Sequence, residues 1–302
     1  MDFVQKPAKH IQRQMEVLTN LAALATASSK ELKTKISDDK QADTKEVSLY
    51  KLEKKILRKV GQAIGDFNLI QDNDRILVAI SGGKDSWVML HALRLLQKKA
   101  PIKFTLIAVN IDQGYGDYRQ DIIEDFVEQE NYEYHMEEFD IARIVAEKSS
   151  PRSIPCSLCA RLRRGYLSGL AEKHNCNKVA LGHHLDDFIE TLLLNSFFIG
   201  KLAAMAPKHV SDDAKTTVIR PLVYCHESDI VDFCKKKNFP IVCCECPLMC
   251  GGNTQYDSKR VFIKKMLGVL ETEVPNIKQS ILTSLGNVKS SHLLDTGLWT
   301  DK

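Results

Sequence analysis

The chain of 302 residues lacks several features that would assign a protein to a class at once. It has no run of about 18 consecutive apolar residues, which excludes a membrane span by length. Its N-terminus has no apolar core of a secretory signal. Its net charge of +3 is too small to indicate a partner. We therefore expect a soluble, cytoplasmic protein with the composition of an ordinary globular chain.

Cysteine is absent from the first half of the chain, and nine cysteines follow from Cys156 onward. In a reducing compartment so many cysteines indicate metal binding or catalysis rather than disulfides. Cys156 and Cys159 form one pair, and a dense group follows at positions 243, 244, 246 and 250. The other three, at positions 176, 225 and 234, stand alone and are predicted to be buried thiols.

The N-terminal part of the chain differs from the rest. Residues 28–45 are polar, charged and poor in aromatic side chains, as linkers are. We interpret residues 1–48 as an extension of unknown function. Residues 49–302 are predicted to form the catalytic domain, with the cysteine-rich segments inside it and toward its C-terminal end.

From residue 49 the pattern alternates between helices and short apolar runs. Strands are expected over 75–80, 103–109, 132–138 and 178–181, with another just past Thr217. Helices are expected over 49–67, from the turn after residue 80 to about 97, and over 118–129, 157–174, 186–198 and 228–237, with a last one from about 257. Strands separated by helices of this length predict an α/β fold with a doubly wound parallel sheet. Such sheets bind ligands beyond the carboxyl ends of their strands.

A glycine-rich turn follows the first predicted strand. Its residues are Ser81, Gly82, Gly83, Lys84, Asp85 and Ser86. Two glycines let backbone N–H groups approach an anion, and the following helix N-terminus adds partial positive charge. The spacing of the Walker motif is absent. The segment resembles the PP-loop of the N-type ATP pyrophosphatases, which implies ATP as a substrate and adenylation of a substrate oxygen with release of pyrophosphate.

Two further segments support an ATP site of this kind. Asn110 and Asp112 end the second predicted strand, where the family places groups that contact the nucleotide. Gly182, Asp186 and Asp187 belong to a segment that resembles the family's G-H-x-x-D-D element. Adjacent carboxylates there can hold Mg²⁺ on the phosphates, because Mg²⁺ binds through few carboxylates and several waters. We assign catalytic roles to Asp85 and Asp187, with Asp187 as the Mg²⁺ ligand.

Cys156 and Cys159 form a C-x-x-C pair at the start of a basic helix. Such a pair suits zinc, a redox dithiol or an iron–sulfur cluster. Cys243 and Cys246 would complete a Cys₄ zinc site, which keeps structural zinc as an alternative. A redox dithiol is disfavoured because the pair lacks a thioredoxin-like βαβ setting.

The combination of SGGKDS, PCSLCARLRRG and GHHLDD is similar to the tRNA 2-thiocytidine synthetase family (the TtcA type). A later cysteine after Phe239-Pro240-Ile241-Val242 and the closing NVKSSHLLD extend the resemblance from about Leu49 to Trp299. The family holds a [4Fe–4S] cluster on three cysteines, which implies Cys156, Cys159 and one residue of the later group. Counting from Pro240 favours Cys244 as the third ligand, with Cys246 as the alternative, because this chain departs from the family's spacing there.

The resemblance implies that cytidine at position 32 of a tRNA anticodon loop is adenylated at its C2 oxygen and then receives sulfur, giving 2-thiocytidine. Arg163 and Arg164 lie one turn beyond Cys159, where they can stabilise phosphate charge or position the RNA. The family also implies a cysteine desulfurase or another sulfur donor as a partner, and a homodimer.

Three alternatives remain open from the sequence. A uridine thiolase of the same superfamily usually carries N-terminal cysteine pairs, which this chain lacks. Lysidine, NAD or GMP synthetases share the PP-loop but have no use for the Cys156 and Cys159 pair. A zinc-stabilised protein that binds RNA without catalysis would not depend on Asp85 or Asp187.

Overall fold

The computed structural model of the protein describes residues 46–148, 156–211, 215–243, 246 and 258–299. The chain divides into two compact units, residues 1–51 and residues 52–302, and the following paragraphs concern the second. The predicted extension, residues 1–48, lies almost wholly outside the described residues, so its boundary stays a prediction and its function stays unknown. No helix in the described part of the chain is long and apolar enough to cross a membrane.

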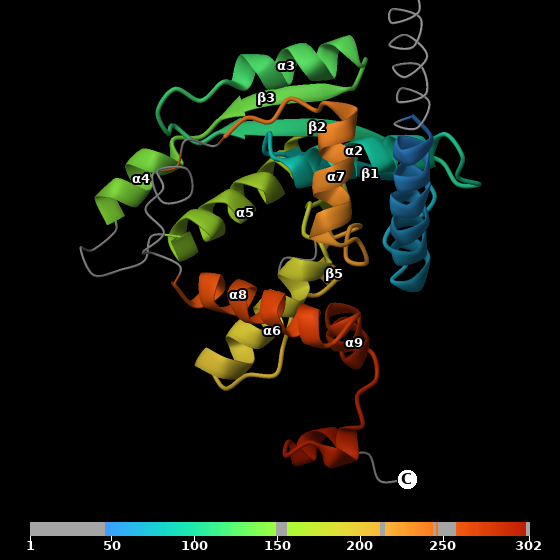
Figure 1. The fold of residues 1–302 in the computed structure, drawn as a ribbon. Helices are drawn as coiled ribbons and strands as arrows, with labels where there is room; N and C mark the ends of the chain where they lie inside the picture. The colour runs from blue at the N-terminus through green and yellow to red at the C-terminus, as the bar shows by residue number, and fades with distance from the viewer. Residues whose placement is uncertain (1–45, 149–155, 212–214, 244–245, 247–257, 300–302) are drawn as a thin grey trace, which may run out of the picture. The chain divides into compact units, whose positions relative to one another are not determined.

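The described strands form a six-stranded sheet in the order β3-β2-β1-β4-β6-β5 (Figure 1). Their bounds are β1 (Asp74–Ile80), β2 (Phe104–Asp112), β3 (Tyr134–Glu138), β4 (Lys178–Ala180), β5 (Lys208–Val210) and β6 (Thr217–Ile219). All neighbouring strands are parallel except β5 and β6. The predicted α/β fold with a doubly wound sheet is confirmed, and the antiparallel edge strand β5 is an addition to it.

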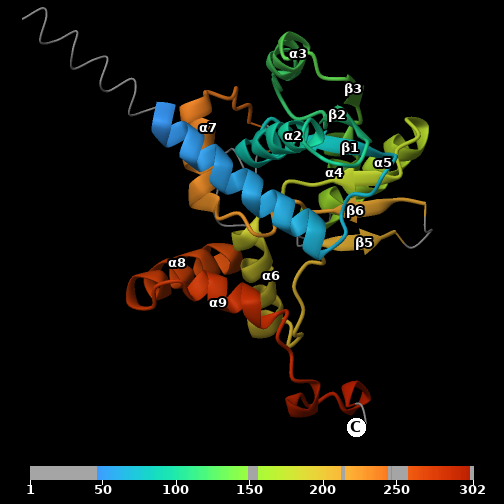
Figure 2. The ribbon, with the colours of Figure 1, turned by 90° about the vertical axis from the view of Figure 1, so that its right-hand side faces the viewer.

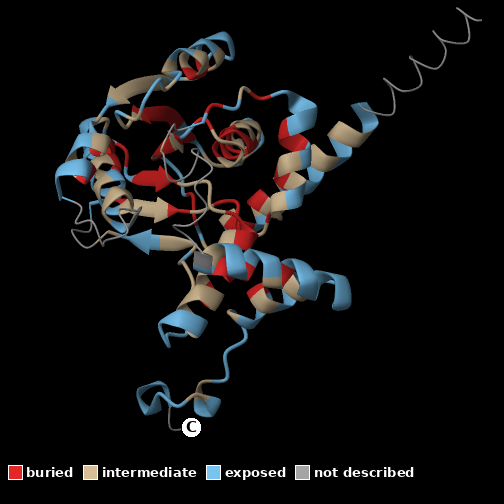
Figure 3. Cartoon of the chain, turned by 60° about the vertical axis from the view of Figure 1, so that its left-hand side comes forward, coloured by how far each residue is buried: buried red, intermediate tan, exposed pale blue. Residues whose placement is uncertain are grey.

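Helices cover both faces of the sheet. On one face, α5 (Cys156–Lys173) packs Leu167 and Leu170 against Leu77 and Ile107 of β1 and β2. Since successive strand residues point to opposite faces, the remaining strand residues meet α2 (Lys84–Gln97) and α3 (Gln120–Gln129) on the other face. The short helix α4 (Ile141–Lys148) packs against α5. The central strands β1, β2 and β4 are the most buried of the sheet, and Figure 3 shows the buried residues gathered there and in the adjoining helices.

A second group of helices packs around α6 (Leu185–Phe198), the helix that follows β4. Helix α6 packs against α8 (Ser258–Glu273) and α9 (Ile277–Ser284), and the three lie side by side in Figures 1 and 2. Helix α7 (Glu227–Lys237) packs against α2. Two 3₁₀ turns, η2 (Ser290–His292) and η3 (Thr296–Leu298), follow near the C-terminus. The C-terminal helices thus reach the same end of the sheet as the glycine-rich turn.

The structure corrects several predicted elements. Helices α4 and α9 and strand β5 were not predicted. Strand β3 begins at Tyr134, two residues later than expected, because Asn131 adopts a left-handed turn with φ of 54°. Helix α9 has only eight residues, and a helix of that length depends on packing against neighbours more than on its own sequence.

Candidate nucleotide and metal site

The order of the strands in the sheet reverses at β1. Strand β2 follows β1 on one side, while β4 lies on the other side of β1. In open α/β sheets ligands bind outside the carboxyl ends of the strands at such a point. The turn after β1 and the loop after β4 meet there.

The turn after β1 is held by its own hydroxyl groups. Ser86 Oγ donates to the carbonyl of Gly83 at 2.8 Å and accepts from the backbone N–H of Ser81 at 3.2 Å. Gly82 has φ of +77°, which favours glycine. Ser86 therefore shapes the loop rather than facing outward, and Gly83 leads directly into the N-terminus of α2.

The loop after β4 approaches the first turn of α2 closely. A Cβ atom on Gly182 would lie 3.1 Å from the carbonyl carbon of Asp85 and 3.2 Å from the backbone nitrogen of Ser86. Both of these neighbours are backbone atoms, which cannot move aside without shifting the helix. The glycine at 182 is what brings the two motifs, about 100 residues apart in sequence, into contact.

Three carboxylates surround the imidazole of His184, and two of them lie near its Nε2 atom. His184 Nε2 lies 3.6 Å from Asp85 Oδ1 and 3.4 Å from Asp187 Oδ2. Asp85 Oδ1 is buried and has no hydrogen-bond partner. A buried carboxylate oxygen without a hydrogen-bond donor lowers the stability of the protein unless a bound cation compensates its charge. Asp85 Oδ1 therefore fits a Mg²⁺ ion. Asp187 lies against the same imidazole, and its Oδ2 also accepts the backbone N–H of His184 at 3.0 Å, so its charge is available beside Asp85 for the same ion.

The described residues hold no group of three or more side chains arranged to bind a metal ion. This agrees with the coordination that Mg²⁺ usually has in nucleotide sites, where one or two carboxylates act together with phosphate oxygens and waters. The site suits a metal that arrives with its nucleotide rather than a resident ion.

Asp186 differs from its neighbour Asp187. Its Oδ2 accepts the backbone N–H of Glu227 at 2.7 Å, and its Oδ1 pairs with Lys278 of α9 at 2.9 Å. Burial opposes its charge, but these donors outweigh burial and lower the pKa of Asp186. Asp186 thus ties α6 to α7 and α9, and the nucleotide contact that we predicted for it stays a prediction.

Lys84 is placed by two carboxylates. Its Nζ lies 3.1 Å from Asp85 Oδ2 and 3.2 Å from Glu227 Oε1. Burial disfavours the ammonium, but Asp85 and Glu227 outweigh it and raise the pKa of Lys84. The amine stays protonated at the mouth of the glycine-rich turn, as phosphate binding requires.

Helix α8 supplies further charges that the motifs did not reveal. Arg260 Nη1 lies 2.7 Å from Glu190 Oε2 and 3.8 Å from Asp187 Oδ1. Lys264 Nζ lies 3.1 Å from Glu227 Oε2. We call the whole charged set the carboxylate site; its members are Lys84, Asp85, His184, Asp186, Asp187, Glu190, Glu227, Arg260, Lys264 and Lys278. Glu190 and the α7, α8 and α9 members belong to no local motif, so no signal in the sequence identified them.

The residues at the end of β2 have internal partners. Asn110 is buried, its Nδ2 donates to the carbonyl of Ile80 at 2.7 Å, and its Oδ1 accepts from Gln120. Asp112 Oδ1 accepts the backbone N–H of Gly114 at 2.8 Å. These bonds hold the strand ends beside the glycine-rich turn, and direct contact with a nucleotide stays a prediction for both residues.

The segment that leads into the later cysteines is bonded to the glycine-rich turn. The backbone N–H of Val242 donates to the carbonyl of Gly82 at 3.0 Å, and Trp87 Nε1 donates to the carbonyl of Pro240 at 2.7 Å. Cys243 and Cys246 are thus one and four residues beyond a contact with the turn. This proximity of a cysteine segment to the phosphate-binding turn was not foreseen.

The predicted cluster ligands are described only in part. Cys159 lies half-buried in the first turn of α5, 3.8 Å from Gln113 Oε1. Cys246 is also a half-buried thiol, whereas Cys243 forms a disulfide, although we predicted metal binding for the clustered cysteines. The side chain of Cys156 and all of Cys244 lie outside the described residues. Arg163 and Arg164 are exposed on α5.

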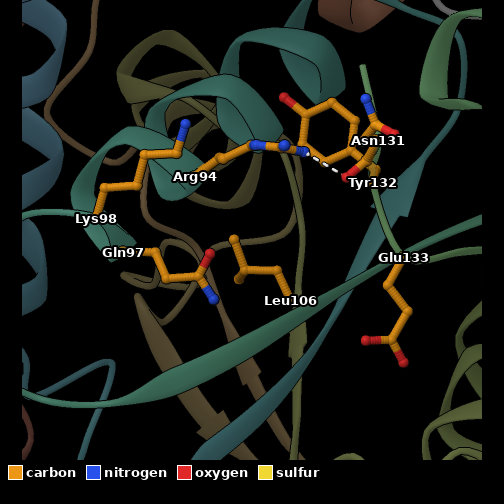
Figure 4. A pocket seen from close by; sticks show the side chains of 7 residues that line it. All are labelled: Arg94, Gln97, Lys98, Leu106, Asn131, Tyr132 and Glu133. Carbon is orange, nitrogen blue, oxygen red and sulfur yellow. Dashed lines mark hydrogen bonds between the residues drawn. The ribbon is translucent and has the colours of Figure 1, made fainter. Parts of the chain in front are cut away.

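A separate pocket has a volume of about 220 Å³, and Figure 4 shows the side chains that line it. Arg94, Gln97, Lys98, Leu106, Asn131, Tyr132 and Glu133 line it. It sits near the amino ends of β2 and β3 and contains none of the predicted site residues. The pocket is therefore not part of the carboxylate site.

Comparison with known proteins places these features in context. Residues 52–245 match the PP-loop domain family. A tRNA-cytidine(32) 2-sulfurtransferase of Citrifermentans bemidjiense is 52% identical over 81% of this chain and 94% of that protein. The enzyme of the same name from Geobacter sulfurreducens is also 52% identical, over 81% of this chain and 94% of its own. The structure of the U34-tRNA thiolase NcsA from Methanococcus maripaludis, solved with its [4Fe–4S] cluster, superposes with a TM-score of 0.64 at 26% identity, covering 83% of this chain and 84% of that one.

Proposed function

Since the chain belongs to the PP-loop domain family and to the tRNA-cytidine(32) 2-sulfurtransferases within it, we propose that it activates a tRNA cytidine with ATP and replaces the C2 oxygen with sulfur. One observation supports the ATP-dependent step. The glycine-rich turn, which contains Asp85, lies against the loop that contains Asp187, at the point where the order of the strands reverses. The substrate base comes from the 52% identity to the cytidine enzymes.

The first step is adenylation of the C2 oxygen. Backbone N–H groups of residues 81–83, the N-terminus of α2 and the Lys84 ammonium bind the β- and γ-phosphates. Asp85 and Asp187 would hold Mg²⁺, which when bound would neutralise charge on the phosphates. The oxygen then attacks the α-phosphorus, and pyrophosphate leaves. Attachment of AMP turns the C2 oxygen into a good leaving group.

The second step replaces AMP with sulfur. Cys156, Cys159 and a third cysteine, Cys244 or Cys246, would hold a [4Fe–4S] cluster, which when bound supplies the sulfur for C2. Cys159 and Cys246 are thiols at this end of the sheet, and thiolates are the ligands that such a cluster requires. Arg163 and Arg164 compensate the charge of the departing phosphate. A cysteine desulfurase as sulfur donor and a homodimeric assembly remain parts of this proposal.

A uridine thiolase is the second candidate, because the structural relative NcsA carries that activity. Nucleoside analysis of tRNA treated with the anaerobically reconstituted enzyme, Mg²⁺-ATP and sulfide separates the two. We expect 2-thiocytidine, with one pyrophosphate released per sulfur inserted. Formation of 2-thiouridine alone would support the second candidate, and thiolation without pyrophosphate release would overturn adenylation.

A further inference from the structure

Three arginines and one histidine form a group beside the carboxylate site. Arg220 directly follows β6, and His183 follows β4, its parallel neighbour in the sheet. The ladder continues past the strands, because the backbone N–H of Leu181 donates to the carbonyl of Ile219 at 3.0 Å. Arg220 and His183 therefore emerge at the same edge. With Arg163 and Arg164 of α5 we call them the basic site.

The guanidinium of Arg220 is oriented but only partly bonded. Its Nη1 donates to the carbonyl of Ala206 at 2.6 Å, and its backbone N–H donates to Pro207. Its Nε is buried and has no hydrogen-bond partner. The edge formed by Nε and Nη2 is the pair of parallel donors that binds a phosphate or carboxylate bidentately.

His183 adds a second buried atom without a partner. Its Nδ1 is buried and unbonded. Burial, then the charges of Arg220 and, more weakly, Arg163, lower the pKa of His183 to about 4, so the imidazole is neutral near pH 7. The charges of Arg220, Asp187 and Arg163 all act on this imidazole, and that of Asp187 opposes the other two. Burial, followed by the charge of Arg164, lowers the pKa of Arg220.

These cations have no acidic partners within the part of the chain that the structure describes. No ion pair joins Arg163, Arg164 or Arg220 to a carboxylate there, whereas Asp186, Glu190 and Glu227 of the neighbouring carboxylate site each pair with a cation. Like charges that gather without a counter-charge are unfavourable unless an anion is bound. Unpaired buried donors and a focused positive field are features of ligand-binding sites.

We propose that Arg220, His183 and Arg163 form a binding site for a phosphate ester group next to the metal carboxylates. Two phosphate esters can occupy it: the AMP phosphate of the adenylated substrate, or a backbone phosphate of the RNA. This inference deepens the proposed function, on which it rests, and it separates the site for this phosphate from the site at Lys84 that binds pyrophosphate.

The test measures binding rather than turnover. Dissociation constants of AMP and of pyrophosphate, each with Mg²⁺, are determined by calorimetry, and that of a tRNA transcript by filter binding. Arg220→Lys keeps the charge but loses the bidentate edge, so we expect AMP to bind about tenfold more weakly, since one charge-assisted hydrogen bond has about this effect. Pyrophosphate binding should stay within about twofold, a shift smaller than any hydrogen bond gives.

Arg163→Gln tests the site without risk to the fold, because Arg163 is exposed. We expect about threefold weaker AMP binding, as for loss of one partly screened charge. Arg161→Gln is the matched control; it removes the same charge from the same helix, about 200° around its axis from Arg163. We expect AMP binding to Arg161→Gln to equal that of the wild type.

The outcomes are distinct. Weaker AMP binding assigns the site to the adenylate phosphate, and weaker tRNA binding with unchanged AMP binding assigns it to the RNA. If Arg220→Lys and Arg163→Gln both bind AMP and tRNA like the wild type, the proposed phosphate site is wrong. Lys84→Met provides the separate check, because unchanged pyrophosphate binding in that variant would refute the nucleotide site itself.

Discussion

The carboxylate site and the basic site lie at the same edge of the sheet, yet their charges are compensated differently. In the carboxylate site Asp186, Glu190 and Glu227 each pair with a cation from α8 or α9. In the basic site Arg220 and His183 each keep a buried nitrogen without a partner. Paired charges hold helices together, and unpaired charges are available to a ligand. The same distinction applies within the carboxylate site, where Asp85 Oδ1 alone among the carboxylate oxygens is buried and unbonded.

The largest effect should come from the carboxylates that we assign to Mg²⁺. Asp85→Asn and Asp187→Asn should each lower ATP-dependent thiolation on the order of 10²-fold, because a metal ligand acts on charge that develops in the transition state. Pyrophosphate release under saturating tRNA measures this step. Asp121→Asn is the control, because Asp121 is exposed on α3 and pairs with Arg119. Near-normal turnover of Asp187→Asn would remove Asp187 from the metal site.

Asp186→Asn should lower the stability of the fold, because Asp186 is a paired charge of the carboxylate site. Lys278 and the backbone N–H of Glu227 would lose a buried carboxylate, at a cost of about 3 kcal/mol in the free energy of unfolding. Urea denaturation measures the change. Glu271→Gln is the matched control, since Glu271 is the exposed second partner of Lys278 and should contribute less than about 0.5 kcal/mol.

The stability that Asp186 contributes should also depend on pH. Its pKa in the folded protein is lowered from the ordinary value of 3.8. The wild type should therefore exceed Asp186→Asn in stability above that value, and the difference should vanish as the pH falls through the lower, folded pKa. A constant difference down to strongly acidic pH would contradict this assignment.

The close approach of the two loops provides a third test. Gly182→Ala places a methyl group 3.1 to 3.2 Å from backbone atoms of α2, so we expect a loss of about 2 kcal/mol and weaker ATP binding. Gly169→Ala in α5 meets nothing within 4 Å and should stabilise the protein by about 0.5 to 1 kcal/mol. Thermal unfolding of both variants measures the contrast. Equal effects would show that the approach at Gly182 is not a constraint.

The smallest effect should follow from removing one of the two carboxylate partners of Lys84. Glu227→Gln leaves Lys84 with Asp85 alone and draws the ammonium toward the metal carboxylate. We expect the Mg²⁺ concentration needed for half-maximal ATP binding to rise about threefold, as for loss of one half-exposed ion pair. Titration with Mg²⁺ at fixed ATP measures it, and an unchanged midpoint would refute a role of Glu227 in placing Lys84.

The predicted order of helices and strands was largely recovered, and the misses have a common cause. Strand β5 and helices α4 and α9 are short, with three, eight and eight residues. Elements of this length carry little hydrophobic periodicity, and tertiary packing decides whether they form. Strands β4 and β6 are equally short but were predicted, and β4 is fully buried whereas β5 is mostly exposed. Helix α9 forms where Leu282 is buried and Lys278 reaches Asp186.

The sequence by itself determined the contiguous parts of the site: the turn at 81–86, the loop at 182–187 and the cysteine pair at 156 and 159. Each is recognisable because neighbouring residues act together through one stretch of backbone. Only the tertiary structure decided that Asp186 links α6 to α7 and α9 while Asp187 caps α6 beside Asp85, and that Glu227 shares Lys84 with Asp85. It also brought Arg220 beside His183 and left both with unbonded nitrogens. The physical reason is that a charged side chain takes its role from its partners, and here those partners come from segments dozens of residues away.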